Sequence, residues 1–305
     1  MERPILSICI PCYNKAEYLE RLITALEPLW DIAEICLFDN GSRDNPTGVL
    51  SGLETKLTVK ILRIDVTGPI DFSWFSALAM GTASYKKLQL ADDLPCAKNI
   101  RQGLELLIRS PGTSYILSSC HISFDSEVGD DKVTQRAAFD SSTALRRQIA
   151  ELQTSRSRAN FVFTNYAFGN NLSDINGVIF RSDALQSMSA TSQNYYLCLT
   201  HPDAEIFLNL FASGPALFWQ EPFSIYLSSP ASPMNLNLHG SDFSQRVYVI
   251  PEMTHSLALL LDPGLRILRR DVDASIYWKF VYRFLKKIIR MSFHSRRREK
   301  LHERT

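Results

Sequence analysis

Two apolar runs near the amino end of the chain are each of strand length, and each ends in a polar turn. Residues 5–11 run into Cys12-Tyr13-Asn14, and residues 33–38 run into the turn at residues 39–44. A helical pattern lies between the two runs, so the order strand, helix, strand predicts a parallel pair. The carboxyl ends of parallel strands open on one edge of a sheet, where ligands bind in open α/β folds, and we expect a binding site there.

The polar residues of these turns are suited to hydrogen-bond a nucleobase and a ribose. They are Asn14, Glu17, Asp39 and Ser42. A local interpretation also fits, in which Asn14 and Glu17 form a capping box and Asn40-Gly41 is only a turn. The two interpretations can coexist, and both remain open at this point.

The rest of the chain predicts a mixed series of elements. The expected strands are 58–65, 115–120, 161–166, 177–180 and two within 215–227, and the expected helices are 94–108, 141–152 and one near 202–212. Residues 67–90 are aromatic and fit neither pattern, so an insertion over the sheet is one interpretation. Residues 228–240 are rich in Ser, Pro and Asn, which predicts a loop and a boundary between a main domain (1–228) and a carboxy-terminal extension (229–305).

Six cysteines are scattered along the chain, mostly within apolar runs, which favours buried thiols in a reducing compartment. Cys9 and Cys12 have Cys-x-x-Cys spacing, but Cys9 lies inside the first strand and the chain has no second such pair. A structural role is therefore favoured over a redox or zinc site. No amino-terminal signal peptide is recognised, and no apolar run approaches the ~20 residues that span a bilayer.

The net charge of +1 conceals a division of the chain. From Lys279 to the end there are ten Lys/Arg and two Asp/Glu, which gives +8, whereas the remainder carries −7. Within a helix expected at about 274–292, aromatic and aliphatic residues fill one arc and basic residues the other. This pattern predicts an in-plane helix on an anionic membrane surface, and the alternative is a helix docked on the main domain or on a second copy of the chain. No nucleic-acid-binding fold accompanies the basic charge, so we expect no nucleic-acid partner.

The two amino-terminal turns resemble those of family 2 glycosyltransferases of the GT-A fold. That family ends its first strand in Pro-x-Tyr-Asn, matched by Pro11-Cys12-Tyr13-Asn14, and its second in Asp-Asp/Asn-Gly-Ser-x-Asp, matched by residues 39–44. The resemblance implies a mostly parallel, Rossmann-like α/β sheet flanked by helices, followed here by a helical appendage. It also implies that a nucleotide is held by a set of residues that comprises Pro11, Tyr13, Asn14, Glu17, Asp39, Asn40, Ser42 and Lys98.

One departure from the family concerns the metal. Family members end the fourth strand in Asp-x-Asp, which holds Mn²⁺ or Mg²⁺ against the diphosphate, but the strand expected at 115–120 runs into Cys120-His121. Three interpretations remain open. His121 and Asp125 (or Glu127) could hold a metal; a cation such as Lys98, Arg101 or Arg181 could replace it; or the chain could be catalytically silent.

The general base implied by the resemblance is an acid at the start of the helix after the acceptor-binding segment. Asp203 occupies that position, with Pro202 in place of the usual glutamate and His201 as a weaker candidate. The local alternative is that Asp203 only favours the positive end of the helix dipole.

These observations favour an inverting glycosyltransferase acting in bacterial surface polysaccharide (lipopolysaccharide-type) synthesis. It would move a sugar from a nucleoside diphosphate sugar to a hydroxyl of a glycan or lipid-linked acceptor, in the cytoplasm at the inner face of the plasma membrane. The first alternative is a silent, membrane-tethered subunit of an assembly complex. A nucleotidyltransferase is disfavoured, because the first turn lacks a Gly-rich basic loop. A homo-oligomer remains open.

Overall fold

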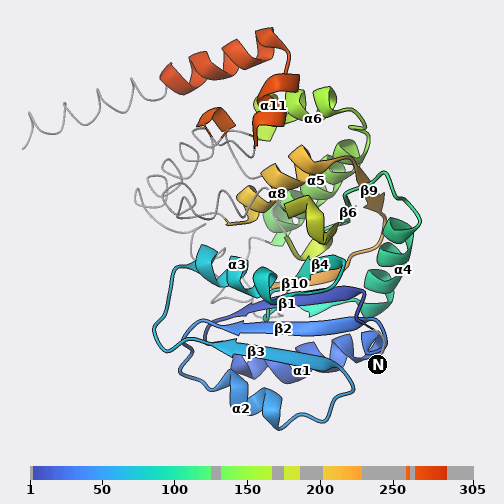
Figure 1. The fold of residues 1–305 in the computed structure, drawn as a ribbon, viewed down its shortest axis with the longest axis vertical. Helices are drawn as coiled ribbons and strands as arrows, with labels where there is room; N and C mark the ends of the chain where they lie inside the picture. Colours follow the sequence, from blue (N-terminus) through green and yellow to red (C-terminus); the bar gives the residue numbers. More distant parts are fainter. Residues whose placement is uncertain are drawn as a thin grey trace, which may run out of the picture.

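The computed structural model describes residues 3–124, 132–166, 175–185, 202–228, 259–261 and 265–286. Its centre is a seven-stranded sheet in the order β3-β2-β1-β4-β8-β6-β9, with a smaller sheet β5-β10-β7 beside it (Figure 1). The strands are β1 (Leu6–Cys12), β2 (Ala33–Asp39), β3 (Thr58–Arg63), β4 (Tyr85–Leu88), β5 (Leu94–Pro95), β6 (Tyr115–Ser118), β7 (His121–Phe124), β8 (Val178–Arg181), β9 (Ala216–Trp219) and β10 (Ser224–Ser228).

Helices connect these strands. They are α1 (Ala16–Leu26), α2 (Pro46–Ser51), α3 (Ile70–Met80), α4 (Ala97–Ile108), α5 (Lys132–Ala150), α6 (Ser155–Phe161), α8 (Pro202–Ser213) and α11 (Arg266–Asp271), with short 3-10 turns at Glu27–Leu29, Ile175–Gly177 and Ser182–Leu185. A further helix covers residues 274–286, which we call the C-terminal helix. Among the described residues, no helix is both long and apolar enough to cross a bilayer.

The main sheet is mostly parallel. β1, β2, β3 and β4 run in one direction, β8 runs against them, and β6 and β9 run with them again. Cys12 pairs with Asp39, so the turns after β1 and β2 begin at the same height on the sheet. The expected strand–helix–strand unit and its common carboxyl edge are thus confirmed.

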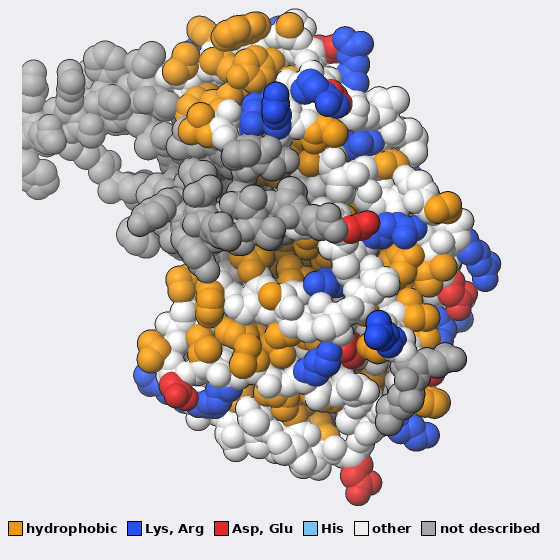
Figure 2. Space-filling model, viewed as in Figure 1, with side chains coloured by type: hydrophobic (Ala, Val, Ile, Leu, Met, Phe, Trp, Pro, Cys, Tyr) orange, Lys and Arg blue, Asp and Glu red, His pale blue; other side chains and the backbone are white. Residues whose placement is uncertain are grey.

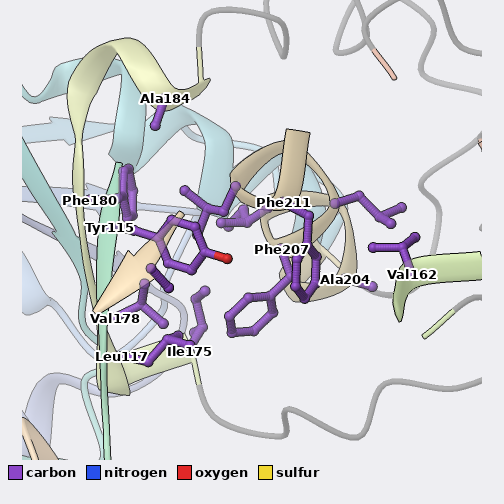
Figure 3. Packing of buried hydrophobic residues seen from close by; sticks show 14 of the residues in the cluster. Tyr115, Leu117, Val162, Ile175, Val178, Phe180, Ala184, Ala204, Phe207 and Phe211 are labelled. Atoms are coloured by element: carbon purple, nitrogen blue, oxygen red, sulfur yellow. The ribbon is translucent and has the colours of Figure 1, made fainter. Parts of the chain in front are cut away.

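Two apolar clusters cover opposite faces of this sheet, because successive strand residues point to opposite sides. On one face Leu6, Ile8 and Ile10 pack with the buried sides of α1 and α4; on the other, Cys9 packs with α3. The second cluster continues into α8, whose Ala204, Phe207 and Phe211 lie against Tyr115 and Phe180 of the sheet (Figure 3). The helix predicted at 94–108 is confirmed as α4, which buries Ile100, Leu104 and Leu107 at helical spacing.

Two expectations about elements were wrong. The apolar run 161–166 is helical, comprising the end of α6 and a π-helical turn, Val162–Tyr166. A capping box between Thr154 and Ser157 starts this helix, and an apolar run buried on several sides cannot be assigned to strand or helix by periodicity alone. The segment 67–90 is not an insertion: it forms α3 and the central strand β4.

The C-terminal helix packs on the body of the protein. Phe280 and Phe284 are 1% and 5% exposed, and the Phe280 ring contacts that of Phe163 edge-on with centroids 5.0 Å apart. The prediction that the whole apolar arc of this helix faces a membrane is therefore wrong for Phe280 and Phe284. These two side chains dock on the main domain, which was the alternative prediction.

Candidate functional site

The turns after β1 and β2 are joined by hydrogen bonds that use the predicted site residues. The backbone amide of Asn14 donates to Ser42 Oγ (3.0 Å), and that of Arg43 donates to Asn14 Oδ1 (2.9 Å). The backbone amide of Asn40 donates to Cys12 O (2.9 Å). These contacts fix the two turns to each other as one ledge along the carboxyl edge of the sheet.

The expected capping box at the start of α1 does not form. Lys15 is the N-cap residue and makes no side-chain capping bond, while the Ala16 amide donates to Asp44 Oδ2 at 2.8 Å. Asn14 adopts a left-handed conformation (φ 51°), which turns its side chain to the second turn instead. The helix is therefore capped by an acid from the neighbouring turn, 28 residues away in sequence.

The ledge also requires unusual backbone conformations. Among the described residues, those with positive φ are Asn14, Gly41 and Asn45; the first two belong to these turns, and Asn45 directly follows the second turn as the N-cap of α2. At Gly41 (φ 76°) an added Cβ would lie 3.0 Å from the Thr67 amide nitrogen. Asn and Gly are the residue types that tolerate the left-handed region of positive φ. This conformational requirement explains why the two turns contain Asn and Gly at these positions.

Asp39 is fully buried at the base of the ledge. Its Oδ1 accepts from the Ser42 amide (2.8 Å) and its Oδ2 pairs with Arg63 Nη1 (2.9 Å), while Arg63 Nη2 also donates to Ser42 O (3.1 Å). Arg63 ends β3 and stands opposite Asp39 in the strand register. Arg63 was not among the predicted site residues, although its position near the end of the third expected strand was a signal for it.

A surface hollow of about 1110 Å³ opens beside this ion pair. Its lining residues come from the second turn, from α2 and from the end of β3: Gly41, Ser42, Arg43, Asn45, Thr47, Ile61, Arg63, Asp65, Val66 and Thr67. The Asn40 side chain fixes one wall, since it donates to Gly68 O and accepts from the Gly68 amide, both at 2.9 Å. A fixed hollow with a charged group in its wall can hold a planar polar ring such as a nucleobase.

The other predicted residues of this region differ in exposure. Tyr13 is 46% exposed and Glu17 is exposed, so both are free to contact a ligand, whereas Pro11 lies half-buried in β1. The Cys12 thiol is buried below them; burial, followed by the Asp39 charge, raises its pKa to about 12. This thiol stays protonated at neutral pH, which fits the expected structural role, and Cys9, Cys36 and Cys96 form no disulfide either.

The strand on the other side of β1 is β4, which corrects the prediction about the metal motif. The sequence pattern predicts the strand at 115–120 as the fourth, but this strand, β6, is separated from β1 by β4 and β8. β4 runs parallel to β1 and leads into Gln89-Leu90-Ala91-Asp92-Asp93 at the same edge as the ledge. Acids therefore do follow the relevant strand: Asp92 and Asp93 are present, and Leu90 stands where an Asp-x-Asp would have its first aspartate.

The two acids of this turn have different environments. Asp93 is buried, and its carboxylate accepts from Asn176 Nδ2 (2.6 Å) and from the Leu227 amide (3.1 Å). Asp92 is partly exposed, and its Oδ2 lies 2.8 Å from Lys15 Nζ. Asp93 thus holds the main sheet to β10, whereas Asp92 faces the site together with Lys15.

The cations considered as replacements for a metal lie elsewhere. Arg101 pairs with Asp31 (2.6 Å), just before β2, and Arg181 donates to Tyr85 Oη (3.0 Å) at the start of β4. Both are therefore at the amino edge of the sheet, opposite the ledge, and these two options are corrected. Lys98 is exposed in the first turn of α4.

His121 is exposed at the start of β7, in the small sheet, and Asp125, Glu127 and His201 lie outside the described residues. Across the part of the chain that the structure describes, no group of three or more His, Cys, Asp and Glu side chains could hold a metal ion. At the carboxyl edge, Asp93 is engaged by two donors and Asp92 by an ammonium. This donor set does not fit a resident divalent ion.

Asp203 lies in the first turn of α8 and is half-buried. α8 leads through Gly214-Pro215 directly into β9, which begins beside Tyr115 at the amino edge of the sheet. Twelve residues of helix span roughly 18 Å, so its amino end is directed toward the carboxyl edge. The arrangement brings Asp203 to the side of the sheet that holds the ledge.

Comparisons with known proteins agree with this geometry. The family model described as "Glycosyl transferase family 2" matches residues 7–69, which include β1 except its first residue, β2, β3 and the ledge. No curated protein sequence matches the chain.

Solved structures with similar folds include Staphylococcus aureus TarS (residues 1–349) in complex with UDP-GlcNAc, at 12% identity and a TM-score of 0.59, covering 92% of this chain and 72% of that chain. Another is the mannosyltransferase PcManGT from Pyrobaculum calidifontis in complex with GDP-Man and Mn²⁺, at 12% identity and a TM-score of 0.54, covering 97% and 76%. The match over the first three strands confirms the predicted resemblance to family 2 glycosyltransferases, and the similar structures confirm the predicted fold.

Proposed function

We propose that the chain moves a sugar from a nucleoside diphosphate sugar to a hydroxyl group of a glycan or lipid-linked acceptor, with inversion, in bacterial surface polysaccharide synthesis. The observation that carries the proposal is the ledge, whose two turns are joined beside a hollow lined by Arg63, the partner of the buried Asp39. The similar structures of TarS and PcManGT hold UDP-GlcNAc and GDP-Man, which supports a nucleotide sugar as the donor here.

In this proposal the base of the nucleotide lies in the hollow. Arg63 presents N–H donors there, and the buried Asp39 carboxylate fixes its guanidinium. Tyr13, Glu17 and Lys98 are the exposed predicted residues that remain available to the rest of the nucleotide. Asn14, Asn40 and Ser42 act mainly by shaping the ledge, because their side chains already bond to neighbouring backbone.

Asp203 is proposed as the general base. It would accept the proton of the acceptor hydroxyl as that oxygen bonds to the anomeric carbon, while the bond from this carbon to the diphosphate oxygen breaks. Attack from the face opposite the leaving diphosphate inverts the anomeric centre. The direction of α8 supports this role, since it points the first turn of the helix toward the carboxyl edge.

The proposal is tested by calorimetric titration with UDP, GDP, CDP and dTDP, each with Mn²⁺ and again with EDTA. We expect one of them to bind, and Arg63→Ala to weaken that binding at least tenfold, whereas Arg109→Ala, at the exposed end of α4, leaves it unchanged. Asp203→Asn should bind the nucleotide normally and lose transfer. If none of the four binds under either condition, the catalytically silent subunit becomes the better account.

We further propose that the protein is peripheral on the inner face of the plasma membrane, through the C-terminal helix. Although Phe280 and Phe284 are buried, Trp278, Tyr282 and Leu285 are 66%, 65% and 51% exposed. They form one stripe at helical spacing beside the exposed Lys279, Arg283 and Lys286. Figure 2 shows hydrophobic side chains on the surface at the upper end of the molecule, where Figure 1 draws this helix. Aromatic and basic residues side by side suit an anionic lipid interface.

Vesicle sedimentation tests this part of the proposal. The chain should sediment with vesicles containing phosphatidylglycerol and not with pure phosphatidylcholine, and a Trp278→Ala/Tyr282→Ala variant should lose the effect. Trp30→Ala, an exposed tryptophan before β2, is the matched control. Binding that survives the double substitution would contradict the assignment, and a concentration-dependent dimer lost in the same variant would instead make the stripe an interface between copies.

A further inference from the structure

The turn that follows β4 forms an ion pair with the start of α1, at the β4 end of the binding edge. Lys15 Nζ lies 2.8 Å from Asp92 Oδ2, and the two side chains are 36% and 38% exposed. Lys15 directly follows the Pro11–Asn14 turn and is the N-cap of α1, so the ammonium reaches from the ledge to the β4 turn. The pair therefore joins the two structures that border the carboxyl edge on either side of β1.

The position of this pair suits the diphosphate of a bound nucleotide. The hollow beside Arg63 lies at the end of β3, and the pair lies at the end of β4, three strands away. With neighbouring strands ~4.8 Å apart, the separation is roughly 14 Å along the sheet edge. A nucleotide with its base in the hollow and its phosphates directed along the ledge would approach Lys15.

The pair leaves little capacity for a divalent ion. One carboxylate, Asp92, reaches the site, and an ammonium already contacts it; the neighbouring Asp93 is buried and engaged by Asn176 and Leu227. Leu90, two residues before Asp92, supplies no ligand, and the Leu90 amide is itself bound by Asn176 Oδ1 at 2.6 Å. Mn²⁺ and Mg²⁺ need several oxygen ligands, so this turn is a weak site for either ion.

The same pair leaves capacity for phosphate. An ammonium has three N–H donors, and the contact with Asp92 uses one of them. Arg21 Nη2 donates to the backbone oxygen of Asp92 (3.1 Å), which adds a second positive charge next to the turn. Two N–H donors of Lys15 thus remain for phosphate oxygens, while the contact with Asp92 orients the ammonium.

We propose that Lys15, positioned by Asp92, binds the diphosphate of the donor in place of a divalent metal. The inference rests on the proposed function and deepens it, because it names the group that neutralises the leaving diphosphate. Asp92 is in this account a positioning residue. It orients Lys15 and does not coordinate a metal.

The test uses the full chain and whichever of UDP, GDP, CDP and dTDP binds it. We expect the Kd to change less than twofold between EDTA and Mn²⁺. Lys15→Ala should raise the Kd at least tenfold in both conditions, and Lys15→Arg should restore part of the affinity. Asp92→Asn should raise the Kd less than Lys15→Ala does. Lys56→Ala, an exposed lysine before β3 at the opposite edge, is the matched control and should leave the Kd unchanged.

Two results would overturn the inference while the proposed function stands. One is nucleotide binding that disappears in EDTA, returns with Mn²⁺ and is lost in Asp92→Asn, because Asp92 would then be a metal ligand. The other is a Lys15→Ala variant that melts normally and binds nucleotide like the unmodified chain. Absence of binding by all four nucleotides is distinguishable from both, since it removes the proposed function itself.

Discussion

The two ends of the binding edge each contain an acid paired with a cation, but the two pairs differ in construction. At the β2 end, Asp39 is fully buried, and both of its oxygens have partners within the turn and β3. At the β4 end, Asp92 is 38% exposed, and it pairs with Lys15, which is 36% exposed. In the first pair only Arg63 is exposed to a ligand and the acid is buried, whereas in the second pair both side chains are partly exposed. Removing one partner of a buried pair destabilises the fold strongly, because it leaves the other charge buried without compensation. An exposed pair contributes little to stability.

The largest effect is expected at the buried pair. Arg63→Ala leaves the Asp39 carboxylate buried with the Ser42 amide as its remaining donor. We expect the free energy of unfolding to fall by about 2–3 kcal/mol, below the full cost of breaking a buried pair because Arg63 is itself partly exposed. Urea denaturation measures the change. A loss below 0.5 kcal/mol, within the ~0.5 kcal/mol of ordinary surface substitutions, would show that Asp39 is not held as described.

A third acid, Glu34 at the amino edge of the sheet, makes the stability of the fold depend on pH. Burial alone would raise the pKa of Glu34, but hydrogen bonds from Lys60, Ser7 and Thr82 lower it to about 2. Since the folded pKa lies below the unfolded value, the carboxylate stabilises the fold above about pH 4.5, and that contribution is lost as the pH falls toward 2.

The Glu34→Gln variant should therefore be about 2 kcal/mol less stable than the unmodified chain at pH 7, with the difference shrinking below pH 4. Chemical denaturation at pH 7, 5, 4 and 3 provides the measurement. A stability difference that stays constant over this range would mean that protonation of Glu34 is not responsible.

The smallest effect on stability is expected at the exposed pair. Lys15→Ala should lower the free energy of unfolding by less than about 1 kcal/mol, because solvent screens both charges. The measurement is the same urea titration, made beside that of Arg63→Ala. The comparison fails if the Lys15 change costs as much as the Arg63 change, since the two pairs would then be equally structural.

Much of the β2 end could be predicted from the sequence, because its determinants are local. Asn14, Gly41 and Asp39 are recognisable where an apolar run stops, and strand, helix, strand order places their turns on one edge. The capping of α1 by Asp44 was not predictable in the same way, since it depends on the left-handed Asn14 and on a contact between separate turns.

The β4 end was not recognised, for a topological reason. Lys86 and Lys87 interrupt the apolar pattern of β4, and the Lys87 ammonium is buried against Gln89 and Ser224 (2.7 and 3.1 Å). A strand whose buried positions include a lysine has no clear periodicity, so the sequence pattern favours the more apolar run at 115–120 as the fourth strand. Which strand borders β1 is decided by pairings across the chain, and Asp92 acquires its meaning only from that order.

The hydrogen bonds of the ledge also bear on the order in which the site is assembled. Those between the first two turns join residues 28 or 29 apart in sequence, whereas Lys15 and Asp92 are separated by 77 residues and Lys87 and Ser224 by 137. Shorter loops close at lower entropic cost, and local contacts form faster. A chain emerging from the ribosome has all the residues of the ledge long before it has β10. During synthesis, the part of the site proposed to hold the base can therefore be in place while the segments that anchor the β4 turn have yet to be made.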